Sequence, residues 1–284
     1  MQRVIGMLGS FGWIGHMASP IKRFVESWRD YPLRAGTVLL RRYELIKLIG
    51  EGSYGLAYLA CDLVEGGELV VKQARPSKGA LGRELLSRER EALLALGHPS
   101  IPRCRGLFEE GGRLFAAIDK AEGRTLEALI FEQQRGFTEV ESLAIIARLL
   151  PIVGFVHERG WVHLDLRIPN VLLQADGSLA LIDFGLARRI GDWTSLVAFT
   201  DEEEARRRAP EVQSDLYALG HFLLFLLYSS YEAQEGQPPR EWHEELSLSE
   251  GTRCVLRRLL LLAEPYRSVG QLREDIEQLL HCEW

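Results

Sequence analysis

Three polar side chains in the middle of the sequence have the spacing of a phosphoryl-transfer site. Asp165 lies five residues before Asn170, and Asp183 begins the triplet Asp-Phe-Gly thirteen residues further on. One carboxylate can orient the hydroxyl group that attacks a phosphate, while an amide and a second carboxylate can hold Mg²⁺ on the phosphates of ATP. By itself this spacing could arise by chance, but together with the motifs upstream it predicts an ATP-dependent phosphotransferase with Asp165 as its catalytic carboxylate and with Asn170 and Asp183 as metal ligands.

A glycine-rich segment upstream offers a place for the phosphates. Gly50, Gly52 and Gly55 form the pattern G-x-G-x-x-G. A dinucleotide-binding fold would place a helix directly after these glycines, but the following residues 56–60 alternate as a strand does. The glycines are therefore predicted to lie on a hairpin, where backbone amides can approach an anion closely because no side chain intervenes. A purely structural hairpin turn is the alternative.

Lys72 follows the apolar run of residues 69–71, which reads as a strand. A desolvated ammonium group needs a counter-charge, and phosphate oxygens or a helix carboxylate would supply one. Glu89 is the best candidate for the helix partner, with Glu84 and Glu91 as competitors on the same predicted helix. If none of these pairs forms, Lys72 is an ordinary residue of an edge strand whose charge reaches water.

The pattern of apolar residues predicts an α+β protein. Alternation favours strands at residues 43–49, 56–60, 68–73, 102–108 and 114–118, and a helical period spans residues 81–96. Beyond Gly123 the chain is predicted to be mainly helical. We expect three parts: an extension over residues 1–36, a small antiparallel-sheet lobe with one helix over residues 37–121, and a larger helical lobe over residues 122–284.

Taken together, six motifs in this order and spacing resemble those of a protein kinase catalytic domain, from about Tyr43 to Leu280. The segment Arg88–Leu93 leading to His98-Pro99 resembles bacterial Ser/Thr kinases in particular. The resemblance implies a bilobal fold, ATP and Mg²⁺ as cofactors, and Ser or Thr hydroxyls of proteins as acceptors.

The same resemblance implies a role for individual residues. Lys72 would bind the α and β phosphates and pair with Glu89, while Arg167 would touch the γ-phosphate. A hinge would receive adenine through its backbone. The remaining implied positions are Ile118 as gatekeeper, Asp119, Lys120 and Ala121 as the hinge, Asp215 as a buried brace of the catalytic loop, and an Arg267–Glu211 pair.

The sequence also departs from the family pattern. Leu164 stands where many kinases carry an arginine that receives a phosphate on the activation segment, so we expect activity without phosphorylation there. Only three residues separate Glu211 from Asp215, so the segment that docks extended peptides in this family is short here. For the same reason, whether Glu211 pairs with Arg267 is left open. A phosphotransferase for small hydroxyl compounds and a nucleotide-binding scaffold are therefore alternatives to a protein kinase.

Glutamates at 202–204 precede arginines at 206–208 by four residues each. This is the favoured orientation for ion pairs along a helix, so a short charged helix is predicted there.

The composition narrows the choice of partners and compartment. A formal net charge of −6 offers no electrostatic reason to bind nucleic acid. Four widely separated cysteines fit reduced thiols in a cytoplasmic protein better than a disulfide framework or a zinc site. No stretch of 18 to 20 uninterrupted apolar residues is present, and residues 216–228 come nearest.

The N-terminal extension carries no catalytic pattern. Ile21, Phe24, Val25 and Trp28 recur at helical spacing and predict an amphipathic helix. It would pack on the domain or on a partner chain, or lie peripherally on an anionic membrane. Residues 3–15 loosely resemble a secretory signal, which is the alternative to a cytoplasmic protein. The oligomeric state is not predicted.

Overall fold

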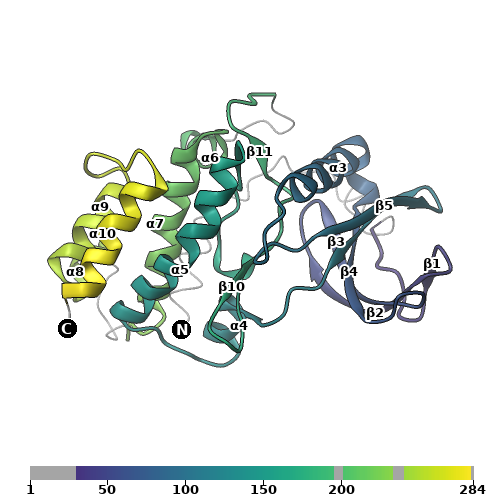
Figure 1. Cartoon of the computed structure of the whole chain (residues 1–284), viewed down its shortest axis with the longest axis horizontal. Helices are drawn as coiled ribbons and strands as arrows, with labels where there is room; N and C mark the ends of the chain where they lie inside the picture. Colours follow the sequence, from purple (N-terminus) through teal and green to yellow (C-terminus); the bar gives the residue numbers. More distant parts are fainter. Residues whose placement is uncertain (1–29, 195–200, 233–239, 283–284) are drawn as a thin grey trace. The chain divides into compact units, whose positions relative to one another are not determined.

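The computed structural model describes residues 30–194, 201–232 and 240–282 (Figure 1). The contacts between its residues divide the chain into two compact units. The first unit contains the described residues up to Glu122 together with Ala180–Arg188, and the second contains Gly123–Leu179 and the described residues from Arg189 onward. One unit is built on an antiparallel sheet and the other is mainly helical, which confirms the predicted α+β class. The amphipathic helix predicted at residues 21–28 lies outside the described residues.

The first unit is a six-stranded sheet with one long helix. The strand order is β1-β2-β3-β4-β6-β5, with antiparallel pairing between neighbours. All five predicted strands and the predicted helix are present, and β1 is a further strand of two residues. The elements are β1 Val38–Leu39, β2 Tyr43–Glu51, β3 Gly55–Asp62, β4 Glu68–Ala74, the 3-10 helix η1 Pro76–Lys78, α3 Gly79–Ala95, β5 Cys104–Glu110 and β6 Arg113–Asp119.

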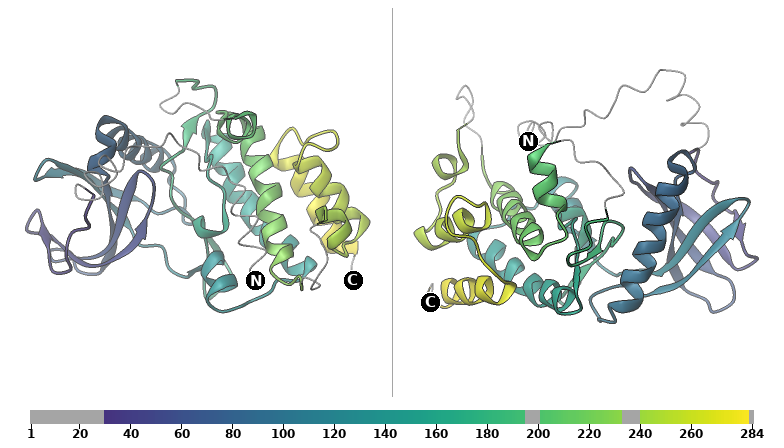
Figure 2. Two further views of the ribbon diagram at one scale, coloured as in Figure 1. Left: turned by 180° about the vertical axis from the view of Figure 1, so that it is seen from behind. Right: turned by 90° about the horizontal axis from the view of Figure 1, so that it is seen from above.

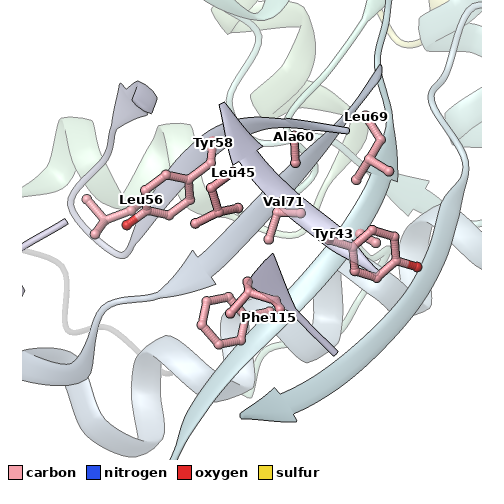
Figure 3. Close-up of a cluster of buried hydrophobic side chains, with 10 residues drawn as sticks. Tyr43, Leu45, Leu56, Tyr58, Ala60, Leu69, Val71 and Phe115 are labelled. Atoms are coloured by element: carbon pink, nitrogen blue, oxygen red, sulfur yellow. The ribbon is translucent and has the colours of Figure 1, made fainter. Parts of the chain in front are cut away.

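One face of this sheet forms an apolar cluster (Figure 3). Successive side chains of a strand point to opposite faces, so alternate residues of each strand reach the same cluster. Its large members are Tyr43, Leu45, Leu56, Tyr58, Leu69, Val71 and Phe115, each no more than 6% exposed. Because Val71 points into this cluster, its neighbour Lys72 must point to the other face.

Helix α3 packs on β4, β5 and β6, as the cartoon views show (Figure 2). Leu85, Leu86 and Leu93 are buried against the sheet, and each contributes roughly 1.5–3 kcal/mol on burial. Glu89 lies on the same buried stripe, only 3% exposed. The helix therefore presents a carboxylate to the side of the sheet that carries Lys72.

The second unit is built around long helices. Helix α5 begins in a capping box formed by Thr138 and Glu141, and it packs against α7 and α10. The elements from residue 123 onward are β7 Arg124–Thr125, α4 Leu126–Phe131, α5 Glu139–Glu158, β8 Trp161–Val162, η2 Ile168–Asn170, β9 Val171–Leu173, β10 Leu179–Leu181, β11 Arg188–Arg189, α6 Glu202–Arg208, α7 Val212–Tyr228, α8 Trp242–Glu245, α9 Glu250–Leu259 and α10 Val269–Cys282. Of these, most of β10 and the first residue of β11 fall in the segment Ala180–Arg188 of the first unit.

A glycine allows strands β7 and β9 to pair. Gly123, just before β7, has φ +107°, and a Cβ there would lie 2.5 Å from the carbonyl oxygen of Leu173 in β9. A side chain is therefore excluded by both backbone conformation and space.

Helix α6 is the charged helix predicted from the glutamate and arginine triplets. Arg207 pairs with Glu203, and Arg208 lies 3.9 Å from Glu204, both at a spacing of four residues. Its N-terminus is capped by Asp201, which accepts a hydrogen bond from the backbone of Glu204.

Among the described helices, α5 is long and apolar enough to cross a membrane by length and composition. It is a different segment from residues 216–228, which the sequence had indicated as the nearest candidate. Half of the apolar window in α5 is buried within the protein, and core helices of soluble proteins pass the same test.

His221 on α7 should make stability depend on pH. Burial, with a further contribution from Arg207, lowers the pKa of His221 to about 4, against about 6.5 in an unfolded chain. Its Nε2 atom has no hydrogen-bond partner among the described residues. The neutral form is favoured by the fold, so its stabilising contribution is complete above pH 6.5 and is lost as the pH falls toward 4.

We expect the free energy of unfolding to fall by about 1–2 kcal/mol between pH 7 and pH 5 through this group. Denaturant titrations at the two pH values would measure this change in the wild type and in His221→Gln, which cannot titrate. The variant should show a smaller loss, and an equal loss in both proteins would contradict the assignment.

Candidate active site

In the first unit, Lys72 is held between two carboxylates. Its Nζ atom lies 2.5 Å from Oε1 of Glu89 and 2.8 Å from Oδ1 of Asp183. Of the competing glutamates on α3, Glu84 pairs with Arg88 at 3.1 Å and Glu91 is exposed. The helical period therefore selects Glu89 as the only one of the three that faces β4.

The charges of this cluster are set by burial and by pairing. Burial by itself would lower the pKa of Lys72, but the carboxylates of Asp183 and Glu89 outweigh it and hold the pKa above its ordinary value. Burial raises the pKa of Glu89, and the charge of Lys72 opposes that rise. The two carboxylates therefore favour the charged form of Lys72, which is the form that can bind phosphate oxygens.

Asp183 lies in the segment Ala180–Arg188, which packs with the first unit, and this packing brings its carboxylate to Lys72. The segment is anchored by the backbone bond from Leu181 to Ser100, 2.8 Å long, and by Phe184, which is fully buried. Asp183 adopts φ +63°, a conformation that costs energy for a residue with a side chain and that recurs at functional sites. Its Oδ1 atom also accepts a hydrogen bond from the Gly185 amide at 3.2 Å.

The glycine-rich segment forms the hairpin turn between β2 and β3, as predicted. The Gly52 amide donates to the carbonyl of Gly55 at 2.9 Å, which closes the turn. Arg75, just after β4, donates its own amide to the carbonyl of Tyr54 at 2.9 Å. A Cβ on Gly55 would lie 3.1 Å from the carbonyl oxygen of Gln73, so little room is left for a side chain where β3 begins to pair with β4.

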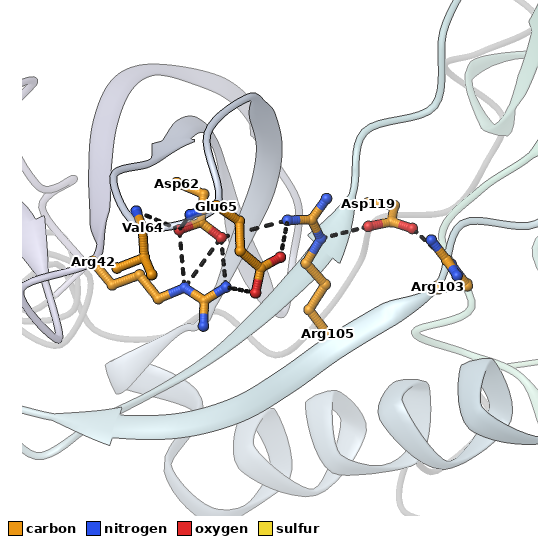
Figure 4. A network of polar contacts seen from close by, with 7 residues as sticks. All are labelled: Arg42, Asp62, Val64, Glu65, Arg103, Arg105 and Asp119. Carbon is orange, nitrogen blue, oxygen red and sulfur yellow. Dashed lines mark hydrogen bonds and ion pairs between the residues drawn. The ribbon is translucent and has the colours of Figure 1, made fainter.

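The predicted hinge follows strand β6. Ile118 is 3% exposed, and the backbone amide of Asp119 donates to the carbonyl of Arg103 at 2.9 Å. The Asp119 carboxylate accepts from Arg105 at 2.6 Å and from Arg103 at 3.0 Å, within a larger network (Figure 4). Burial opposes these bonds, but the two arginines prevail and hold the pKa of Asp119 below its ordinary value. The side chain of Asp119 is therefore engaged with the two arginines, and it secures the end of strand β6.

The second unit holds the catalytic motif around Asp165. Nδ2 of Asn170 donates to the Asp165 carbonyl at 2.9 Å and to its Oδ2 atom at 2.7 Å. Arg167 meets the same carboxylate through Nε at 2.8 Å and Nη2 at 2.9 Å. Because both bonds of Asn170 use its amide nitrogen, its amide oxygen is the atom suited to a cation.

Asp215 braces this motif from helix α7, as the resemblance implied. Its carboxylate is fully buried and accepts from the backbone amides of His163 and Leu164, each at 2.8 Å. Nε2 of His157 on α5 lies 2.9 Å away. Burial raises the pKa of Asp215, but the hydrogen bond and charge of His157 and the backbone bond from His163 outweigh it and lower the pKa overall.

The hydrogen bonds from the amides of His163 and Leu164 to Asp215 hold the backbone of Leu164 at φ +60°. Sequence reasoning missed His157, because only the packing of α5 on α7 brings it to Asp215.

The structure does not form the pair between Arg267 and Glu211 that the sequence had left open. Arg267 lies 3.2 Å from Glu264, three residues before it, and its side chain is 83% exposed. Glu211 is instead the residue that precedes the first turn of α7. The buried neighbour Tyr266 bonds to Asp275 at 2.7 Å, so the loop is secured by a different side chain.

The two residues predicted to be metal ligands both offer oxygen donors, Asn170 in the second unit and Asp183 in the first. No group of three or more His, Cys, Asp or Glu side chains able to hold a metal occurs in the described part of the chain. Mg²⁺ commonly takes only one or two protein carboxylates and completes its shell with phosphate oxygens and water. The oxygens of Asn170 and Asp183 are ligands of the required kind.

Comparison with known proteins gives consistent matches. The sequence model of the family described as "Protein kinase domain" matches residues 43–268. The probable serine/threonine-protein kinase YbdM of Bacillus subtilis is 34% identical over 253 residues, which cover 88% of this chain and 94% of YbdM.

Two further relatives are longer proteins. Serine/threonine-protein kinase PknA of Nostoc is 30% identical over 270 residues, or 85% of this chain and 47% of PknA. Serine/threonine-protein kinase B of Synechocystis is 28% identical over 270 residues, or 83% of this chain and 46% of that kinase. This chain therefore spans nearly all of YbdM and about half of the other two.

Proposed function

The chain belongs to the protein kinase domain family, and on that premise we propose that it transfers the γ-phosphate of Mg-ATP to Ser or Thr hydroxyls of proteins. The observation that carries the proposal is the Lys72 ammonium, held 2.5 Å from Glu89 and 2.8 Å from Asp183. A buried cation between two carboxylates is a costly arrangement, and it suits a site that must receive a polyanion. The serine/threonine kinase names of its relatives support the acceptor class.

Each group has a defined task in this proposal. Lys72 and the amides of the glycine-rich turn would bind phosphate oxygens, and the backbone of the hinge would receive adenine. Asp165 would orient the acceptor hydroxyl and take its proton, while Arg167 would meet the γ-phosphate. Asn170 and Asp183 would hold Mg²⁺, which supplies positive charge for the transferring phosphoryl group.

The test is transfer of labelled γ-phosphate from Mg-ATP to a generic basic protein, with the Asp165→Asn protein as blank. We expect protein label that requires Mg²⁺, and acid hydrolysis should return it as phosphoserine or phosphothreonine. Phosphotyrosine alone would contradict the acceptor class. The absence of both protein label and ATP consumption would favour a nucleotide-binding scaffold.

A phosphotransferase for small hydroxyl compounds is the second candidate. Helix α7 begins at Val212, directly after Glu211, so little chain remains to form a platform for extended peptides. The same assay distinguishes the two candidates when a panel of metabolites replaces the protein. ATP consumption that rises with a metabolite, in the absence of protein label, would favour the small acceptor.

We further propose that activity does not require phosphorylation of the activation segment. Leu164 is 6% exposed and donates its amide to Asp215, so this position offers an apolar side chain instead of a phosphate-binding arginine. The hydroxyl residues of this segment that could accept a phosphate are Thr194, which the structure describes, and Ser195 and Thr200, which lie outside the described residues.

Phosphatase-treated protein, with removal of phosphate verified by mass spectrometry, should keep its turnover number within about two-fold of the untreated protein. Replacing Thr194, Ser195 and Thr200 by alanine provides a second form that cannot be rephosphorylated there. Inactive dephosphorylated protein that recovers on phosphorylation of any of these residues would contradict the proposal.

A further inference from the structure

A buried carboxylate precedes the sheet of the first unit and has no role in the proposed chemistry. Asp30 is only 9% exposed. Oδ1 accepts from the Ser77 amide at 2.9 Å, and Oδ2 accepts from the Ser77 hydroxyl at 2.5 Å and from Nη1 of Arg75 at 3.3 Å. A carboxylate is buried at this level only when such donors replace its water.

Arg75 connects this carboxylate to the glycine-rich turn. Its side chain is 18% exposed, and its Nε atom donates to the carbonyl of Gly52 at 2.6 Å. The amide of the same residue donates to the carbonyl of Tyr54, and its Nη2 lies 3.8 Å from Glu51. Arg75 therefore contacts three residues of the turn, Glu51, Gly52 and Tyr54, while its guanidinium group also binds Asp30.

The planar guanidinium group makes this connection directional. Nε and Nη1 are fixed in one plane, so a carboxylate that holds Nη1 also limits where Nε can point. Helix α3 approaches from another side, because a Cβ on Gly82 would lie 3.2 Å from the Arg75 carbonyl and 3.4 Å from that of Tyr54. The glycine-rich turn is thus held by contacts with both Arg75 and helix α3, and its position follows from the orientation of Arg75.

We propose that Asp30 is a positioning residue for nucleotide binding. By orienting Arg75 toward the carbonyl of Gly52, it sets the glycine-rich turn in the conformation that receives the phosphates of ATP. This inference rests on the proposed function, since the turn matters here only if ATP is the phosphoryl donor. Residues before the sheet thereby become part of the nucleotide site through one arginine.

A purely structural role predicts a different result. Leu33 also ties this segment to the sheet, through its amide and the Tyr58 hydroxyl at 3.1 Å. If Asp30 merely anchored the segment, its loss would reduce stability and leave the affinity for ATP unchanged. The Kd and KM for ATP, compared with the thermal stability of the same variant, therefore separate the two roles.

The experiment compares wild type with Asp30→Asn, Arg75→Lys and the double variant. Arg75→Lys keeps the charge but removes the Nε donor, and it leaves Asp30 with its bonds to Ser77 if Asp30→Asn fails to fold. Arg83→Gln is the matched control, because it breaks an exposed ion pair with Glu109 in the same unit, 2.8 Å long, which involves neither Arg75 nor the residues of the turn. We would measure Kd for a non-hydrolysable ATP analogue, KM for ATP, kcat and thermal stability.

Each single variant should raise Kd and KM about five-fold with kcat within about two-fold, and the double variant should be no worse than the worse single variant. Arg83→Gln should match wild type. Unchanged Kd and KM in Asp30→Asn or in Arg75→Lys, with wild type binding the analogue normally, would overturn this inference alone. Wild type that neither binds the analogue nor uses ATP would overturn the proposed function and this inference with it.

Discussion

Replacing Asp165 by Asn is expected to reduce the turnover number by roughly 10²- to 10⁴-fold, the range for loss of a general acid–base group. Asn has nearly the same shape and can still accept from Nδ2 of Asn170, now 2.7 Å from the carboxylate. It cannot take a proton or hold the charge that Arg167 meets through two bonds. The defect should therefore appear in kcat, with little change in the Kd for ATP.

The matched control is Asp176→Asn, the same chemical change on an exposed turn of the second unit. Asp176 accepts from the amide and hydroxyl of Ser178 and touches none of the proposed catalytic groups. We expect wild-type turnover in this variant. Normal turnover in Asp165→Asn would show that another group accepts the proton, and equal losses in both variants would indicate a fault of folding instead of chemistry.

Replacing Lys72 by Met should lower kcat/KM by roughly 10²- to 10³-fold, because the positive charge that would bind the α and β phosphates and position ATP for transfer is lost. It also leaves Glu89 buried, 3% exposed, without its cation. Removing one partner of a buried pair costs about 3 kcal/mol in the free energy of unfolding. We expect a folded protein that is both inactive and less stable, measured by steady-state kinetics and denaturant titration.

Two further variants separate these effects. The double variant Lys72→Met with Glu89→Gln removes the uncompensated charge, and it should recover much of the stability without recovering activity. Lys47→Met makes the same change at an exposed position of strand β2 and should leave both properties unchanged. Substantial turnover in either variant that lacks Lys72 would mean that this lysine does not bind the phosphates.

Features that depend on neighbouring residues were predictable from the sequence. Strands β2 to β6 and helix α3 follow from alternation with period two and from the helical period, because burial of one face imposes these patterns. The hairpin at Gly52 could be predicted because a strand follows the glycines. The motif around Asp165 closes on itself within five residues, so its hydrogen bonds to Asn170 are local contacts.

Features that depend on packing could not be predicted in the same way. Glu89 was only the best of three glutamates until the helix was placed on β4, and the carboxylate of Asp119 proved to secure the end of strand β6. The sequence left open whether Arg267 pairs with Glu211, and the structure places Arg267 beside Glu264 instead. Period and spacing do not reveal which of several equivalent charges will meet.

The sequence by itself thus determined the order of elements, the types of the reactive groups and the class of chemistry, since these depend on short-range patterns. Only the tertiary structure decided which charges combine: Lys72 with Asp183 across 111 positions, and Asp30 with Arg75 across 45. The physical reason is that a buried charge must find a partner wherever the fold places one, and many polar residues in the sequence could serve. The sequence determines that each buried charge needs an oppositely charged residue, and the packing of helices and strands determines which residue that is.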